Sequence, residues 1–282
     1  MGEYQYYEFL ALDRPLTAAE QDEVRSLSTR AGITATSFTN EYHWGDFRGD
    51  PGELMRRYYD AHLYLASWGT HRIMLRLPRT LLDPEVARQY CVEDGLAVSV
   101  TDEHVIIDMT SEDDEGEWDE GEEDSLSAIV GVRAELAAGD LRPLYLAWLS
   151  AYGMWERDED AFDEEDEDVP EPPVPAGLRS LTAAQRALAG FLRLDPDLLE
   201  AAAEPSPSRP ASQDDPLKLA AFIAGLPDGE KDRLLLMIAQ DHGARAKMEL
   251  LHGLRGNPDG PRDSPARRTV GAILDGAALR RQ

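Results

Sequence analysis

The sequence predicts an α+β protein: a mainly antiparallel N-terminal sheet with short helices, then a helical hairpin and an all-α C-terminal region. Three observations carry this prediction. Within residues 1–110, short runs rich in aromatic and β-branched residues alternate with segments that begin at helix-capping residues. Two pairs of these runs are separated by short turns, which is typical of hairpins. Beyond residue 125, apolar residues recur at helical spacing.

The first expected elements are a strand and a capped helix. The mixture of aromatic and aliphatic side chains over Tyr4–Leu12 predicts the strand. Thr17 is a favourable N-cap and Glu20 completes a capping box three residues later, so a helix should begin there. We expect Gly32 to end that helix. The run Thr34–Tyr42, rich in Thr, Phe and Tyr, predicts a second strand.

Two further helices and two hairpins complete the predicted domain. Asp50 and Asp83 each precede a proline, and aspartate at the cap with proline at the first helical position favours a helix start. The hairpins pair apolar runs across short polar or glycine-containing turns. Their four expected strands are His62–Trp68, His71–Leu77, Leu96–Val100 and His104–Met109.

The negative charge is concentrated in the middle of the chain. The 282 residues carry 55 Asp and Glu against 28 Lys and Arg, a formal net charge of −27. Residues 111–171 hold 23 of the acids and 3 of the bases, so −20 of the total lies there. Glu112–Asp124 has 10 acids and Glu156–Glu171 has 11. Like charges at this density repel one another, so we expect both runs to be extended, solvated loops.

Helical segments lie between and after these acidic runs. Residues 125–155 predict a helical hairpin that turns at Gly139–Asp140. The proline-rich stretch around residues 172–177 is typical of a stiff linker, and we place a domain boundary there. The predicted organisation is an α+β domain over 1–110, acidic loops flanking the hairpin over 111–171, the linker 172–177, a small helical region over 178–255, and a tail with a short helix over 256–282.

Motifs for common catalytic chemistry are absent from the sequence. The six histidines form no His-x-x-x-His pair and Cys91 has no accompanying motif, which disfavours zinc binding and a catalytic thiol. No phosphate-binding or serine-hydrolase motif occurs. No apolar run approaches the ~20 residues of a membrane span. We therefore expect a cytosolic protein with no metal or cofactor, and a non-enzyme rather than an enzyme.

The acidic runs have three interpretations. Calcium binding is disfavoured, because Glu112–Glu123 lacks the alternating ligand ladder of a calcium loop. The runs can be solvating spacers, or they can dock into a basic groove of a partner protein. Trp118 in the first run and Phe162 in the second favour docking, because large aromatic side chains are enriched at interfaces and add nothing to the solvation of a spacer. The candidate docking residues are Glu112, Asp113, Asp114, Glu115, Trp118 and Phe162.

A second candidate site is the loop between the second predicted strand and the helix that follows Asp50. Its Trp44, Asp46, Phe47 and Arg48 combine aromatic rings with charges, and such a loop can stack a base or bind an anion. The alternative is that the two aromatic side chains plug the open end of the sheet. A cleft that joined Asp46 and Arg48 with His43 would favour an active site.

Six short stretches form a recognisable set: Tyr4–Phe9, Arg14–Thr17, Leu27–Ala31, Trp44–Pro51, Asp60–Tyr64 and Met74–Pro78. Together they resemble a bacterial protein family with no assigned activity, over most of the chain. The resemblance implies no catalytic residue or cofactor. It implies a genetic neighbourhood with SWIM-type zinc-finger proteins, which would supply a nucleic-acid-associated partner.

The main functional prediction is a non-enzymatic interaction protein whose acidic segments engage a basic protein partner. One alternative is an enzyme with an active site near Trp44–Arg48 that no short motif reveals. Another is a nucleic-acid-associated factor that acts through a partner. Direct binding to nucleic acid is disfavoured, because the net charge of −27 leaves no basic surface to release counterions.

Overall fold

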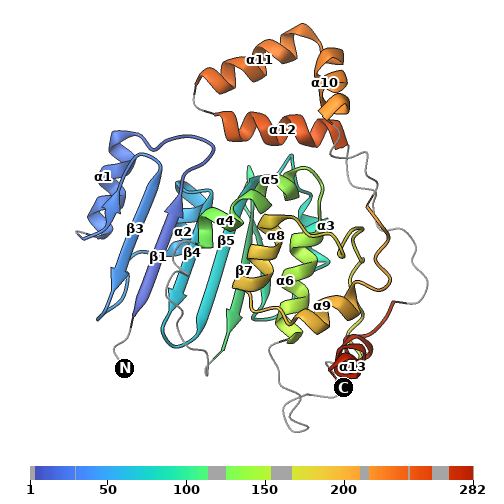
Figure 1. Cartoon of the computed structure of the whole chain (residues 1–282). Coiled ribbons are helices and arrows are strands. Elements are labelled where there is room, and N and C mark those ends of the chain that lie inside the picture. The colour runs from blue at the N-terminus through green and yellow to red at the C-terminus, as the bar shows by residue number, and fades with distance from the viewer. Residues whose placement is uncertain are drawn as a thin grey trace.

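The computed structural model describes residues 4–28, 30–113, 125–153, 167–209, 216–240, 242–255 and 267–281. Within them, a seven-stranded antiparallel sheet has the order β2-β3-β1-β4-β5-β7-β6 (Figure 1). The strands are β1 (Gln5–Leu10), β2 (Gly32–Ile33), β3 (Ser37–Tyr42), β4 (Ala61–Ala66), β5 (Thr70–Pro78), β6 (Leu96–Val100) and β7 (His104–Glu112). With helices in the C-terminal half, this architecture confirms the predicted α+β class.

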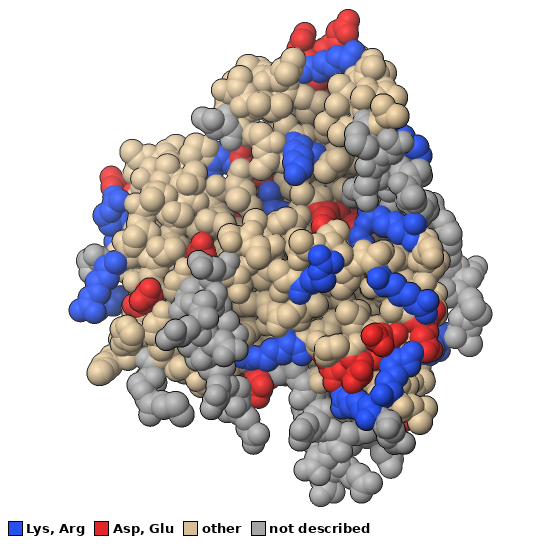
Figure 2. Space-filling view, in the orientation of Figure 1, with Lys and Arg blue, Asp and Glu red and all other residues tan. Residues whose placement is uncertain are grey.

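Helices cover both faces of the sheet. α1 (Ala18–Leu27) and α2 (Pro51–Arg57) lie on one face, where Val24 and Met55 pack with Phe9 of β1. The other described helices are α3 (Pro84–Arg88), α4 (Ser125–Ile129), α5 (Gly131–Ala137), α6 (Arg142–Gly153), α8 (Ala183–Phe191), α9 (Pro196–Ala202), α10 (Pro216–Gly225), α11 (Asp228–Ala239), α12 (Gly243–Arg255) and α13 (Val270–Arg280). Acidic and basic side chains are interspersed on the face drawn in Figure 2.

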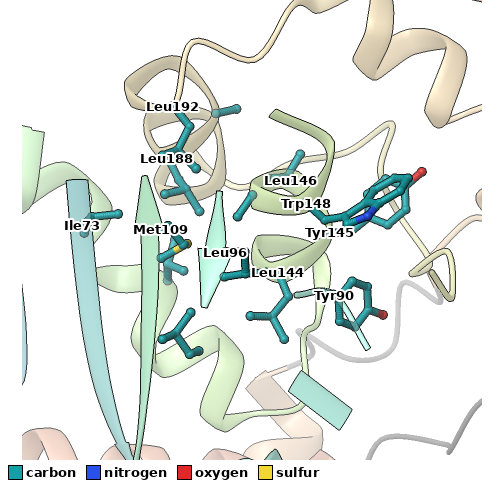
Figure 3. Packing of buried hydrophobic residues seen from close by; sticks show 14 of the residues in the cluster. Ile73, Tyr90, Leu96, Met109, Leu144, Tyr145, Leu146, Trp148, Leu188 and Leu192 are labelled. Atoms are coloured by element: carbon teal, nitrogen blue, oxygen red, sulfur yellow. The ribbon is translucent and has the colours of Figure 1, made fainter. Parts of the chain in front are cut away.

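The larger core lies between the sheet and the helices of the middle and C-terminal segments. Because successive side chains of a strand point to opposite faces, Ile73 and Leu75 of β5 face this core while Met74 faces α2. Leu144 and Trp148 of α6 belong to the same buried cluster, together with Leu96 and Met109 (Figure 3). The predicted helical hairpin therefore packs on the sheet.

The capping predictions are confirmed. Thr17 accepts a hydrogen bond from the Glu20 backbone N–H, and the Glu20 side chain accepts one from Thr17. The Asp50 carboxylate caps α2 by accepting hydrogen bonds from the N–H groups of Gly52 and Glu53. The predicted helix end is wrong, however, because α1 already stops at Leu27. Gly32 instead begins β2, whose backbone pairs with β3.

Two further boundaries differ from the sequence prediction. Glu112, the first acid of the first run, is the last residue of β7 and pairs with Thr70 of β5, so it lies in the sheet and not in a loop. The first helix of the hairpin is divided into α4 and α5. α8 packs closely against this division, since a side chain at Gly131 would lie 3.3 Å from Ala184.

The C-terminal segments return to the same core. Leu188 and Leu192 of the α8 region and Ile273 of α13 join the cluster beneath α6. Glu171, the last residue of the second acidic run, is buried and not solvated as expected, and it forms an ion pair with Arg268 at 2.7 Å. The predicted division of the chain into domains stays a prediction. The predicted helix in the tail is α13.

A buried ionic network ties the sheet to α5. The Arg133 guanidinium donates to both carboxylate oxygens of Asp13 at 2.7 and 2.6 Å, and its Nε donates to the Arg76 carbonyl. Arg76 in turn donates to Asp60 at 2.8 Å, and Asp60 also accepts from the backbone N–H groups of residues 12 and 13. Burial alone would raise the pKa of Asp60, but the guanidinium groups of Arg133 and Arg76 outweigh it and lower that pKa.

His62 is fully buried between the sheet and α2. Its ring stacks on Phe9 with a centroid separation of 3.9 Å. Nδ1 lies 2.9 Å from the Glu8 carbonyl oxygen, so Nδ1 carries the proton. Nε2 has no hydrogen-bond partner among the described residues. Burial lowers the pKa of His62 to about 3, because a charged imidazolium would lose its hydration there.

His62 should therefore make stability depend on pH. In the unfolded chain it binds a proton near pH 6.5, whereas the folded protein resists protonation down to about pH 3. Between these values the unfolded state holds more protons, so acidification should lower the free energy of unfolding by about 1.4 kcal/mol per pH unit. We expect His62→Phe to flatten the slope by that amount in denaturant titrations at several pH values. An unchanged slope would contradict this assignment.

Candidate functional site

Metal ligands do not come together in the part of the chain that the structure describes. Those residues contain no group of three or more His, Cys, Asp and Glu side chains suited to holding a metal ion. Across the same residues, no helix is long and apolar enough to cross a membrane. Two surface pockets and one end of the sheet, at which β3, β4 and β7 finish, are the candidate sites.

The first pocket, of about 480 Å³, lies between the turn after β5, the β6–β7 turn and α12. Arg79, His104 and Arg245 line it together with Asp102 and Glu103. Burial and the nearby Arg76 guanidinium lower the pKa of His104, so its ring is mainly neutral at pH 7. The mixed charges of this pocket favour neither an anion nor a cation.

The second pocket, of about 390 Å³, is a groove between α1 and α2. Arg48 lines this groove, and its guanidinium has no ion-pair partner among the described residues. Arg57 pairs with Glu23 at 2.8 Å, and the Tyr58 hydroxyl donates to the same carboxylate. Burial and this hydrogen bond raise the pKa of Tyr58 to about 12, so Tyr58 is a poor general base at neutral pH.

The predicted aromatic plug is confirmed for Phe47 and wrong for Trp44. Phe47 is buried and packs against the ring of Tyr7, with a centroid separation of 5.2 Å. Trp44 is 70% exposed. Gly45 lies between them with φ +80°, a conformation that favours glycine, and the chain turns there. One aromatic side chain therefore enters the core while the other points to solvent.

Neither of the two pockets described above joins the residues expected of a scattered active site. Asp46 accepts a hydrogen bond from the Gln5 side chain at 3.0 Å. His43 packs on the ring of Tyr4, with a centroid separation of 5.1 Å. Only Arg48 of this set lines the groove between α1 and α2.

Two exposed tryptophans lie at one end of the sheet, where β3 and β4 finish. Trp44 follows the end of β3, and Trp68, which is 44% exposed, follows the end of β4. Gln5 at the start of β1 pairs with Tyr42 of β3 on one side and Ala66 of β4 on the other. The ends of β3 and β4 are therefore level and two strand spacings, about 10 Å, apart.

The first acidic run begins at the same end of the sheet. Glu112 is the final residue of β7, and the Asp113 N–H donates to the Gly69 carbonyl at 3.2 Å, next to Trp68. The Arg193 guanidinium also donates to the Gly69 carbonyl, at 2.7 Å, so a cation lies near this end of the sheet as well. We name Trp44, Asp46, Trp68, Glu112 and Asp113 the aromatic–acidic edge.

Gly69 fixes the start of the run against the β4–β5 hairpin. Its φ is +95°, and a Cβ atom there would lie 1.7 Å from the Asp113 carbonyl oxygen. Only glycine permits this approach of two backbones. The backbone at Asp113, where the first acidic run begins, is thus held against the glycine that follows Trp68.

The remaining predicted docking residues, Asp114, Glu115, Trp118 and Phe162, lie outside the described residues. Sequence reasoning missed Trp68, because it was assigned as the last residue of the strand His62–Trp68. A signal was present. Trp68 directly precedes a glycine at a hairpin turn, where side chains are usually exposed.

Comparison with models of protein families, with curated proteins and with solved structures yields no match for this chain.

Proposed function

We propose that this chain is a non-enzymatic cytosolic interaction protein that binds a basic segment of a partner protein at the aromatic–acidic edge. The observation that carries the proposal is the exposure of Trp44 and Trp68, at 70% and 44%, at the end of the sheet where the first acidic run begins. Tryptophan is highly buried on average, and aromatic side chains are enriched at interfaces. Two exposed tryptophans at one edge therefore favour a binding surface.

The chemistry of this edge fits arginine and lysine side chains. The face of an indole ring attracts a guanidinium or ammonium group, with an energy of ~0.5–1 kcal/mol when exposed and ~2 kcal/mol when desolvated. Asp46, Glu112 and Asp113 supply counter-charge at the same end of the sheet. The other carboxylates of the two acidic runs would attract the same partner over longer distances and speed the encounter.

The alternatives have less support. An enzyme would need the charged loop residues to share one cleft, and among the described residues Arg48 lines the groove without His43 or Asp46. A nucleic-acid-associated role through a partner fits the proposal, because proteins that bind nucleic acid carry basic surfaces. That role depends on the partner and not on this chain's own contacts.

A fluorescently labelled octa-arginine peptide tests the proposal. We expect the full chain to bind it, and the double variant Trp44→Ala, Trp68→Ala to bind about tenfold more weakly, since two cation–π contacts are lost. Fluorescence anisotropy at fixed salt measures both dissociation constants.

The matched control is Leu279→Ala on α13, which truncates another large apolar side chain that is 72% exposed. Its affinity for the peptide should equal that of the parent chain. If the tryptophan double variant also binds as the parent chain does, the aromatic–acidic edge is not the docking site.

A further inference from the structure

The α10–α12 segment leaves an unusual amount of apolar surface uncovered. α11 contains the uninterrupted apolar run Leu234–Ala239, yet none of its residues is buried. α10 is apolar along most of its length, with Lys218 its one charged residue. A helix that is apolar on all sides is normally enclosed by other elements.

One side of this segment is occupied by contacts with the rest of the protein. Ala246 and Met248 of α12 are buried, and His242 and His252 donate from Nδ1 to the carbonyls of Asp13 and Ala137. α11 is tied to α12 by the ion pair between Arg233 and Glu249 at 2.7 Å. The side of α11 that faces away from α12 therefore has no cover among the described residues.

The uncovered side chains form the outer leucine face, which we define as Ile223, Leu235, Leu236 and Ile238. The three residues of α11 are each more than half exposed. Leu235 and Ile238 are three residues apart and so lie on one side of the helix. Figure 2 shows mainly uncharged side chains over this upper part of the molecule, which is α10–α12 in Figure 1.

Charge distinguishes the occupant of this face from the basic partner proposed above. Residues 216–240 carry 3 acids and 3 bases and have no net charge, in a chain whose total is −27. A basic segment would gain no electrostatic attraction at this face. An apolar, locally neutral surface is the matching partner, and a two-fold axis supplies one, because each copy presents the same patch to the other.

We propose that the outer leucine face is the contact of a two-fold dimer of this chain, with α10 and α11 of each copy packed together. Short helices are marginal in water unless an apolar face is packed. α11 already packs on α12, and a second copy, which is present wherever the chain is made, would cover its exposed side. α11 is about 18 Å long, so the interface is at the small end of specific interfaces and the dimer should be micromolar.

Sedimentation equilibrium of the full chain tests the dimer. The apparent mass should rise with concentration toward twice the chain mass of 31.3 kDa. The double variant Leu235→Lys, Ile238→Lys should raise the dissociation constant at least about tenfold. Leu279→Lys, at an equally exposed leucine on α13, should leave it unchanged. A parent chain that remains monomeric at about 0.1 mM would overturn the proposal.

Salt separates this inference from the proposed function. Added salt screens the repulsion between two acidic copies, so the dimer should persist or strengthen, whereas binding of octa-arginine should weaken. The dimer can be absent while octa-arginine still binds, and octa-arginine binding can be absent while the dimer still forms.

Cysteine cross-linking provides a measurement that does not depend on the folding of a disrupted variant. In a Cys91→Ser background, Leu235→Cys, Leu236→Cys and Ile238→Cys are oxidised one at a time. At least one should give a covalent dimer, and Leu279→Cys should not. If none of the three cross-links above the Leu279→Cys level, the outer leucine face is not the dimer contact.

Discussion

Replacement of Arg133 by methionine is expected to lower the free energy of unfolding by about 3–5 kcal/mol, because it leaves buried carboxylates without their cation. Asp13 loses both hydrogen bonds from the guanidinium, and Asp60 loses a charge 3.6 Å away. The low pKa of Asp60 makes its contribution to stability fully present above about pH 4, and that contribution is lost as the pH falls through its folded-state value.

Denaturant unfolding at neutral pH measures this loss. The control is Arg25→Met on α1, which breaks an exposed pair with Asp22 of similar length, 3.1 Å, and should cost at most about 0.5 kcal/mol. A loss below about 1 kcal/mol for Arg133→Met would mean that the buried network contributes little more than a surface ion pair.

Local signals in the sequence predicted much of the fold. The caps at Thr17 and Asp50 and the hairpin alternation depend on residues two to four positions apart, so they can be read directly from the chain. The pairing of Asp13 with Arg133 joins residues 120 positions apart, and no local pattern indicates it. The end of α1 was also missed, because the helix stops at Leu27 and Gly32 pairs with β3 instead of ending the helix.

The candidate site was predictable only in part. The sequence indicated the loop that holds Trp44 and Phe47, but packing with Tyr7 and Phe9 determines which aromatic side chain is buried. The proximity of Trp68 to Asp113 follows from the register of β5 and β7, which is a property of the assembled sheet.

Neutralisation of the first acidic run should slow capture of a basic partner. Replacing the acids of Glu112–Asp124 with Ser and Asn removes 10 of the negative charges. Electrostatic steering raises association rates by about 10–1000-fold, so we expect association to slow at least about tenfold at low salt. Folding should be intact or slightly more stable, because repulsion within the run is relieved.

A control variant tests whether the slower association arises from loss of this run or from the change in net charge alone. This variant removes four exposed acids elsewhere, at Asp22, Asp102, Glu103 and Asp228. When both variants are measured at about 0.1 M salt, this control should slow association much less per carboxylate removed, because charges farther than about 10 Å from the approaching cation are then screened.

The most direct measurement is the stopped-flow association rate constant of the full chain with labelled octa-arginine, followed as salt rises to about 0.15 M. The proposed docking role predicts that the parent chain associates much faster than the neutralised chain at low salt, and that the two rates converge as salt is added. Equal rates for the two chains at low salt would contradict it and would show that the acidic run is a spacer.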